Sequence, residues 1–322
     1  EFLISKEKIE IASSICKVDL LSDLVGEFPE LQGTIGGYFA NSQGFEKDIC
    51  TAVSEHYLPI GLDSAVPRKP YSVALSLSDK IDSLVGFFGI NLKPTSSKDP
   101  YALRRLAIGL IKMILESKKK IHLKNLINYS CELYAEQSIE FDIKRVQKEL
   151  IDFFHERFRN YMREKGIRQD IIESSTDNYN IDNLLTVYDK ALIFNKLILK
   201  QVGSNVMFSY KRASNILISE KKNINMEILG SSDPGLFKSN YEKNLYKKIH
   251  DIRKDFTSVS KENDYEVLLE SLASAKEEVS SFFDNVIVND KDEVLKKNRL
   301  ELLKMLCNTF DKYFNFSKVE SI

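Results

Sequence analysis

Apolar residues recur every three to four positions along most of the chain, which is the spacing of helices that bury one face. The pattern predicts helices over 73–88, 100–114, 121–135, 144–165, 182–200, 204–220 and 264–289, and a last helix that begins at a capping box of Asp290 and Glu293. No stretch of any length alternates apolar and polar residues as a half-buried strand does. The sequence therefore predicts an all-α fold.

The chain of 322 residues is long enough for about two domains. Gly and Pro concentrate before residue 101, where they predict short helices broken by turns. The polar stretch ESSTDNYNID at 173–182 marks the main boundary. We expect a helical domain over 1–145, a helical linker over 146–180 and a second helical domain over 181–322.

Charge is strongly segregated, although the whole chain carries a formal net charge of only −1. Residues 93–124 hold nine Lys and Arg against two acids, a net of +7. Residues 17–67 hold two Lys against eight acids, a net of −6. A basic stripe on a nearly neutral protein favours a localised anionic partner over general polyanion binding.

Composition excludes several classes of protein. The four Cys are scattered without a C-x-x-C pair, which is typical of reduced thiols in a cytosolic protein. No apolar run approaches the roughly 18 residues of a membrane span, and no signal peptide opens the chain. The sequence does not begin with Met, so we expect a processed chain or part of a longer one.

Few residues suggest catalysis. The four His are dispersed, and a metal phosphohydrolase of the His-Asp type needs several His and Asp around its ions. His250-Asp251 has no second His nearby, and His56 alone cannot form a metal shell. Asp79 and Asp82 could do acid–base work, but a salt bridge or a helix cap accounts better for them. No phosphate-binding glycine loop is present, and we expect neither a catalytic nor a metal site.

The stretch LKPTSSKDPYALRR at 92–105 gathers basic residues around a turn. Asp99 suits an N-cap and Pro100 the first helical position. The basic residues are either the solvated edge of a capped helix or contacts to an anion: Lys93, Lys98, Arg104 and Arg105.

A second basic segment is YKRASNIL at 210–217. It offers Tyr210, Lys211, Arg212 and Asn215 within two helical turns, a combination that could bind a loop base and its phosphate. A helix surface with a capping Asn explains the same pattern equally well.

These segments resemble one family over nearly the whole chain. CKVDLLSDLVGEFPELQGTIGGYFA (16–40), EHYLP (55–59), SDKIDSLVGFFGINLKPTSSKDPYALRR (78–105), YKRASNIL and FFDNVIVNDKDEVLKKNRLELL (282–303) are similar to the C-terminal half of the bacterial glycyl-tRNA synthetase β subunit. One departure is Ser96, where the family usually has Gly. If that Gly serves a positive φ, Ser96 would carry mild strain or a shifted turn.

The resemblance implies an α₂β₂ ligase whose α subunit carries the class II core for glycine and ATP. It implies a degenerate His-Asp-type helical domain followed by a helical anticodon-binding domain like that of arginyl-tRNA synthetase. This chain would then bind tRNA(Gly) in the cytoplasm, with neither membrane nor DNA as partner. It would be a subunit fragment that is not catalytic alone, with no cofactor of its own, while ATP and Mg act through the α subunit.

That reading makes seven residues the expected tRNA contacts: Lys93, Lys98, Arg104, Arg105, Lys211, Arg212 and Asn215. Two other functions stay open: the remnant of a His-Asp metal phosphohydrolase, and a helical scaffold for subunit assembly. A large exposed apolar face would favour the scaffold.

Overall fold

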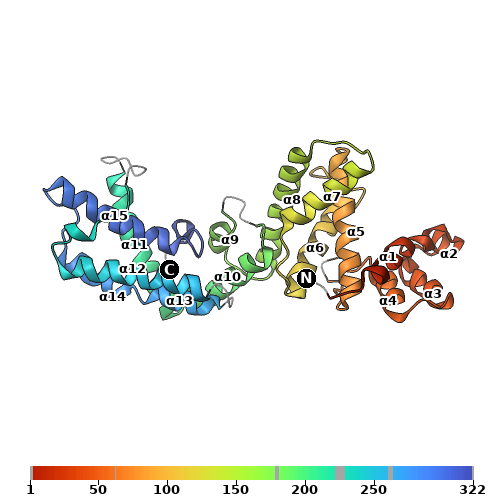
Figure 1. Cartoon of the computed structure of the whole chain (residues 1–322), viewed down its shortest axis with the longest axis horizontal. Helices are drawn as coiled ribbons and strands as arrows, with labels where there is room; N and C mark the ends of the chain where they lie inside the picture. Colours follow the sequence, from red (N-terminus) through yellow and green to blue (C-terminus); the bar gives the residue numbers. More distant parts are fainter. Residues whose placement is uncertain (1–2, 62, 178–180, 222–228, 260–263, 321–322) are drawn as a thin grey trace. The chain divides into compact units, whose positions relative to one another are not determined.

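The computed structural model describes residues 3–61, 63–177, 181–221, 229–259 and 264–320. Within these ranges every regular element is a helix, which confirms the all-α prediction. The chain forms two compact units (Figure 1). Unit 1 is Glu1–Tyr161 with Ile181–Leu185, and unit 2 is Met162–Asn180 with Thr186–Ile322.

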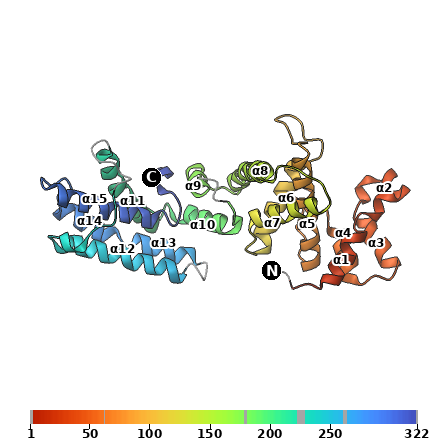
Figure 2. The same cartoon turned by 45° about the horizontal axis from the view of Figure 1, so that its top comes forward.

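Unit 1 begins with short elements and continues with longer helices. Its elements are α1 (Lys6–Ile15), η1 (Val18–Leu21), α2 (Asp23–Glu27), η2 (Pro29–Leu31), α3 (Thr34–Ser42), α4 (Lys47–Glu55), α5 (Pro70–Gly89), α6 (Leu103–Ser117), α7 (Leu123–Glu136) and α8 (Ile143–Glu164), whose last turn enters unit 2. Helix α4 packs against α1, α3 and α5, and α5 also packs against α6 and α7 (Figure 2). Helix α5 is therefore the central helix of the unit.

The predicted core faces are confirmed in α5 and α8. Helix α5 starts at Pro70, whose fixed φ suits the first turn. Its predicted apolar positions are all buried: Val73, Leu77, Ile81, Leu84 and Phe88. The α8 positions are buried as well: Val146, Leu150, Phe154, Phe158 and Tyr161. Gly166, with φ of 78°, follows the end of α8 as predicted, because glycine adopts this conformation without strain.

Unit 2 contains α9 (Gln169–Ser175), most of α10 (Leu184–Leu197), α11 (Gln201–Glu220), η4 (Pro234–Leu236), α12 (Asn240–Val259), α13 (Tyr265–Ala273), α14 (Lys276–Asn285), α15 (Glu293–Phe310) and η5 (Phe316–Lys318). Helix α11 packs against α13, α14 and α15. The apolar repeat over 264–289 belongs to two helices, not one, because the chain turns between α13 and α14.

The prediction of a capping box at the start of α15 was wrong. The N-cap is Asp292, whose carboxylate accepts from the backbone N–H groups of Val294 and Leu295. Asp290 instead binds Arg299, with 2.7 Å between Oδ2 and Nη1.

An aromatic cluster fills the core of unit 2 around the end of α15. Phe316 lies within ring contact of Phe194, Tyr210, Phe310 and Phe314. Such rings bury a large apolar area and pack in defined tilted or edge-on arrangements. The cluster fixes α11 against α15 and the C-terminal turn.

A buried ion pair joins the start of α12 to α15. Arg299 Nε lies 2.9 Å from Glu242 Oε1, and both side chains are at most 8% exposed. The other oxygen of Glu242 accepts from the backbone N–H groups of Lys238 and Ser239. Because burial raises the pKa of a carboxyl while these donors lower it more, the pKa of Glu242 falls below its usual value.

Candidate nucleic-acid interface

The basic turn before α6 is held by its own hydrogen bonds. Thr95 donates its backbone N–H to the carbonyl of Lys98, and its hydroxyl oxygen accepts from the N–H of Lys98. The carboxylate of Asp99 accepts from the N–H groups of Leu103 at 2.9 Å and Arg104 at 3.0 Å. The turn is therefore a rigid start to the helix.

The helix begins later than the sequence predicted. The first helical residue is Leu103 instead of Pro100, because Ala102 adopts a left-handed conformation with φ of 54°. Asp99 supplies the capping carboxylate as predicted, but from three residues before the N-cap position. The positive φ values near this turn occur at Asn91 and Ala102 and not at Ser96, so the expected strain at Ser96 is absent.

Two of the four predicted tRNA contacts in this turn take part in its structure. Lys93 Nζ lies 2.6 Å from Glu149 Oε1, and both side chains are about one-third exposed or less. The guanidinium of Arg104 donates to the carbonyl of Thr95 and lies 4.0 Å from Asp99. These contacts orient both side chains and compete with any outside anion.

The other two basic residues of the turn are available. Lys98 and Arg105 are exposed, and neither forms an ion pair with another described residue. Tyr101, which the sequence analysis did not select, is 46% exposed and stacks on Phe87 with 4.3 Å between ring centroids. An exposed ring beside two free cations can stack on a base while the cations bind phosphate.

The basic stretch does not continue evenly along α6. Lys112 is buried, and its amine donates to the carbonyl of Ser64 at 2.8 Å, so it is not part of a solvated stripe. Lys118, Lys119 and Lys120 are exposed beyond the C-terminal end of α6. A 15-residue helix is about 22 Å long, so the basic charge gathers at two separate ends.

The second predicted region forms one face of α11. Phe208, Lys211, Arg212 and Asn215 follow the i, i+3, i+4, i+7 spacing of a single helical face, and each is at least partly exposed. Helix α14 lies beside this face. We call the combined surface the α11–α14 face: Phe208, Lys211, Arg212, Asn215, Lys276, Phe283 and Asp284.

Aromatic rings and one carboxylate position Arg212 on this face. Its Cζ lies 4.8 Å from the ring centroid of Phe283 and 5.6 Å from that of Phe208. Its Nη2 lies 3.2 Å from Asp284 Oδ1. Lys276 Nζ lies 5.8 Å from the Phe208 ring and adds a second cation. Cation–ring contacts of this kind hold a guanidinium in place without consuming its hydrogen-bond donors.

Tyr210 is not part of this face, contrary to the suggestion from the sequence. Its side chain is 4% exposed, and its hydroxyl donates to Asp311 Oδ2 at 3.3 Å. Burial raises the pKa of Tyr210 well above its usual value. The sequence identified only the polar residues of this face. Phe208 lies just before the basic segment 210–217, and the α14 residues reach the face through tertiary packing.

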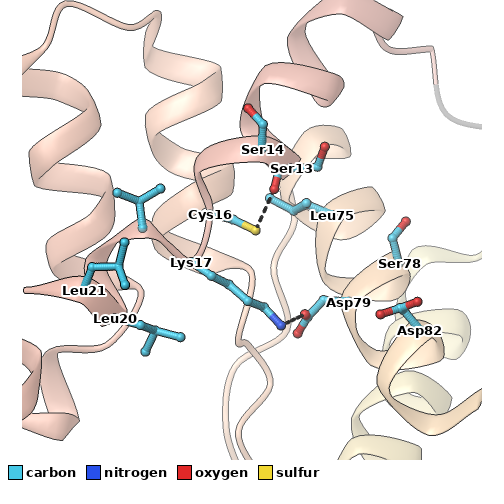
Figure 3. Close-up of a pocket in the computed structure, with 11 residues that line it drawn as sticks. Ser13, Ser14, Cys16, Lys17, Leu20, Leu21, Leu75, Ser78, Asp79 and Asp82 are labelled. Carbon is cyan, nitrogen blue, oxygen red and sulfur yellow. Dashed lines mark hydrogen bonds and ion pairs between the residues drawn. The ribbon is translucent and has the colours of Figure 1, made fainter. Parts of the chain in front are cut away.

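Unit 1 also contains a pocket of about 590 Å³ at the end of α1, beside η1 and α5 (Figure 3). Lys17 reaches across it to form an ion pair with Asp79 of α5, while Leu20 and Leu21 line the opposite side (Figure 3). The expected salt-bridging role is thus confirmed for Asp79. Asp82 lines the same pocket, and burial raises its pKa.

The predicted structural role of His56 is also confirmed. Its ring is fully buried, and Nδ1 lies 2.6 Å from the carbonyl oxygen of Val53. Burial lowers its pKa, so the ring is neutral at physiological pH. Among the described residues, no three His, Cys, Asp or Glu side chains come together as a metal site would require.

The sequence profile of the glycyl-tRNA synthetase beta subunit matches residues 1–177, more than half of the chain. The chain belongs to the glycyl-tRNA synthetase beta subunit family. The profile of the DALR anticodon binding domain matches residues 206–321, which include the whole α11–α14 face.

Curated relatives support the same family. The glycine--tRNA ligase beta subunit of Rickettsia typhi is 37% identical over 318 residues, and that of Rhodospirillum centenum is 35% identical over 315. The beta subunit of Cereibacter sphaeroides is 33% identical over 309 residues. These alignments cover 96–98% of this chain but 44% of each relative, so the chain spans less than half of their length. None of its described helices has the length and apolar character needed to cross a bilayer.

Proposed function

We propose that this chain is the tRNA-binding part of the β subunit of an α₂β₂ glycine–tRNA ligase in the cytoplasm. It positions tRNA(Gly) while the α subunit joins glycine to the tRNA with ATP and Mg²⁺. The α11–α14 face carries this proposal, because it presents two rings, an arginine and two lysines within the region that matches an anticodon-binding domain. Rings and cations on one rigid surface are what an unpaired anticodon loop requires.

The two basic regions divide the work. We assign the positioning of tRNA to residues 1–145 and anticodon binding to 181–322, with the helical segment 146–180 between them. At the turn before α6, Lys98 and Arg105 contact phosphates, and Tyr101 offers a stacking surface. Lys93 and Arg104 act mainly by holding this turn in shape.

Binding of tRNA(Gly) by the α–β complex at graded salt tests this proposal. We expect affinity to fall steeply with salt, and the slope to shrink by roughly one unit for each phosphate contact that is removed. Lys98→Ala with Arg105→Ala removes two such cations from unit 1, and Lys211→Ala removes one from unit 2. If all these variants bind tRNA(Gly) as tightly as the parent, with the same salt slope, the surface assigned here is wrong.

An exposed apolar segment favours assembly as a second role of unit 1. Five apolar side chains of η1, α2 and the following residue are 37–87% exposed: Val18, Leu20, Leu21, Leu24 and Phe28. Exposed apolar groups that lie together typically mark protein contacts. Leu21→Glu would then weaken association with the α subunit while leaving tRNA binding unchanged.

A further inference from the structure

One charged pair on the α11–α14 face is held in place but not saturated. Arg212 and Asp284 share a single hydrogen bond of 3.2 Å, and among the described residues neither side chain makes another. The Arg212 side chain is 34% exposed and that of Asp284 is 61% exposed. A guanidinium has five N–H donors and a carboxylate accepts at about four positions. Donors and acceptors therefore lie side by side with capacity for a ligand.

The surroundings of the pair restrict its motion. Phe283 and Phe208 lie within 4.8 and 5.6 Å of the guanidinium carbon, and both belong to helices packed against each other. A guanidinium held against rings loses less freedom on binding than a lysine would. Phe208 is 36% exposed, so it adds accessible apolar surface beside the pair for the base to contact.

We propose that Arg212 and Asp284 together read one cytosine of the anticodon, an inference that rests on the proposed function. The Watson–Crick edge of cytosine presents the N4 amino donor beside the N3 and O2 acceptors. Asp284 can accept from N4, while Arg212 donates to N3 and O2. Uracil places its O4 against the carboxylate and its N3–H against the guanidinium, so both contacts become repulsive.

The genetic code supplies a reason for such a reader. Glycine codons have the form GGN, so the anticodon of every tRNA(Gly) has cytosine at its second and third positions. A donor–acceptor pair specific for cytosine at either position would reject tRNAs for amino acids whose anticodons carry uracil there. Because the pair offers one carboxylate and one guanidinium, it reads one of the two cytosines.

The test measures kcat/KM for aminoacylation by the complete α–β enzyme. The substrates are tRNA(Gly) and two transcripts in which uracil replaces cytosine at the second or the third anticodon position. We expect Arg212→Ala to lose about 10- to 100-fold on the natural tRNA. It should also distinguish cytosine from uracil less well at one position, where the Asp284 carboxylate remains, while its discrimination at the other position stays unchanged.

Asp284→Asn gives a sharper signature. An amide can accept from N4 of cytosine or donate to O4 of uracil, so this variant removes the repulsion at O4 and should weaken the preference for cytosine at the position that Arg212 affects. It should gain activity on that uracil transcript, an effect that loss of structure cannot produce. Asp251→Asn is the matched control, because Asp251 forms an exposed pair with Lys254 on α12 and should leave discrimination unchanged.

Two results would overturn the inference in distinguishable ways. If Arg212→Ala and Asp284→Asn keep the parent's discrimination at both positions, the pair does not read a base, although anticodon binding still stands. If the parent aminoacylates both uracil transcripts as well as the natural tRNA, anticodon reading itself fails. Should Arg212→Ala melt at a lower temperature, Arg212→Lys replaces it in the test, because it keeps the charge but not the paired donors. Weaker discrimination by Arg212→Lys supports the inference, and unchanged discrimination overturns it.

Discussion

Lys80 of α5 provides a stability prediction that depends on pH. Its side chain is 1% exposed, and Nζ donates to Ser76 Oγ at 2.9 Å and to the carbonyls of Leu58 and Tyr57 at 3.0 and 3.1 Å. These partners are neutral, so they do not offset the cost of burying the charge. Burial therefore lowers the pKa of Lys80 from 10.5 to about 8.

The sign of the effect follows from proton binding. Between pH 8 and 10.5 the unfolded chain keeps a proton on Lys80 that the folded chain has released. The free energy of unfolding therefore rises with pH across this window and is lowest below it. At roughly 1.4 kcal/mol per pKa unit, the full rise is about 3 kcal/mol.

The perturbation is Lys80→Met, which keeps a long apolar stem but exchanges no proton. Urea unfolding followed by far-ultraviolet circular dichroism at intervals from pH 7.5 to 10.5 gives the free energy of unfolding for parent and variant. We expect the parent to gain about 3 kcal/mol relative to Lys80→Met over this range. Lys6→Met, at an exposed lysine on α1, should run parallel to the parent. If the free energies of parent and Lys80→Met change in parallel with pH, burial does not lower the pKa of Lys80 in the folded chain.

Three further predictions concern single contacts. Arg299→Ala leaves the Glu242 carboxylate buried and unpaired, so we expect a loss of about 3–5 kcal/mol in urea unfolding, which Glu242→Gln in the same chain should partly reverse. Arg104→Ala should lower the melting temperature by loosening the turn before α6, whereas Arg105→Ala should melt like the parent and reduce the salt slope of tRNA binding; the opposite pattern would reverse their roles. Gly37→Ala would place a Cβ 2.6 Å from the Cβ of Ser54 in α4, so we expect a lower melting temperature. An unchanged melting temperature would show that α3 and α4 can separate freely.

Sequence periodicity predicted the helices that bury a continuous apolar face, such as α5 and α8. It did not give the bounds of α12, because that helix contains long charged runs and buries only a narrow stripe, including Leu245, Ile249 and Ile252. It also merged α13 and α14, since an apolar repeat can continue across a turn between two helices. The spacing of apolar residues alone does not show where one helix ends and the next begins.

The candidate interface shows the same limit. The sequence grouped Lys211, Arg212 and Asn215 correctly, although it also included Tyr210, which is buried. The contribution of α14 could not be predicted, because Phe283 reaches Arg212 across more than sixty residues of chain. The burial of Lys112 escaped prediction for the same reason, since its partner is the carbonyl of Ser64.

Helix α11 has a consequence for interpreting genetic screens. Its outward face carries Arg212, while Tyr210, on its inward face, packs against Phe310 and Phe316. Substitutions in that aromatic cluster would loosen the helix and produce alleles that fail to aminoacylate only at raised temperature. Substitutions on the outward face would be defective at every temperature. A temperature-sensitive allele at Phe316 would therefore report on how the aromatic core holds the proposed anticodon-binding face, and second-site suppressors should map to neighbouring core positions instead of to the tRNA.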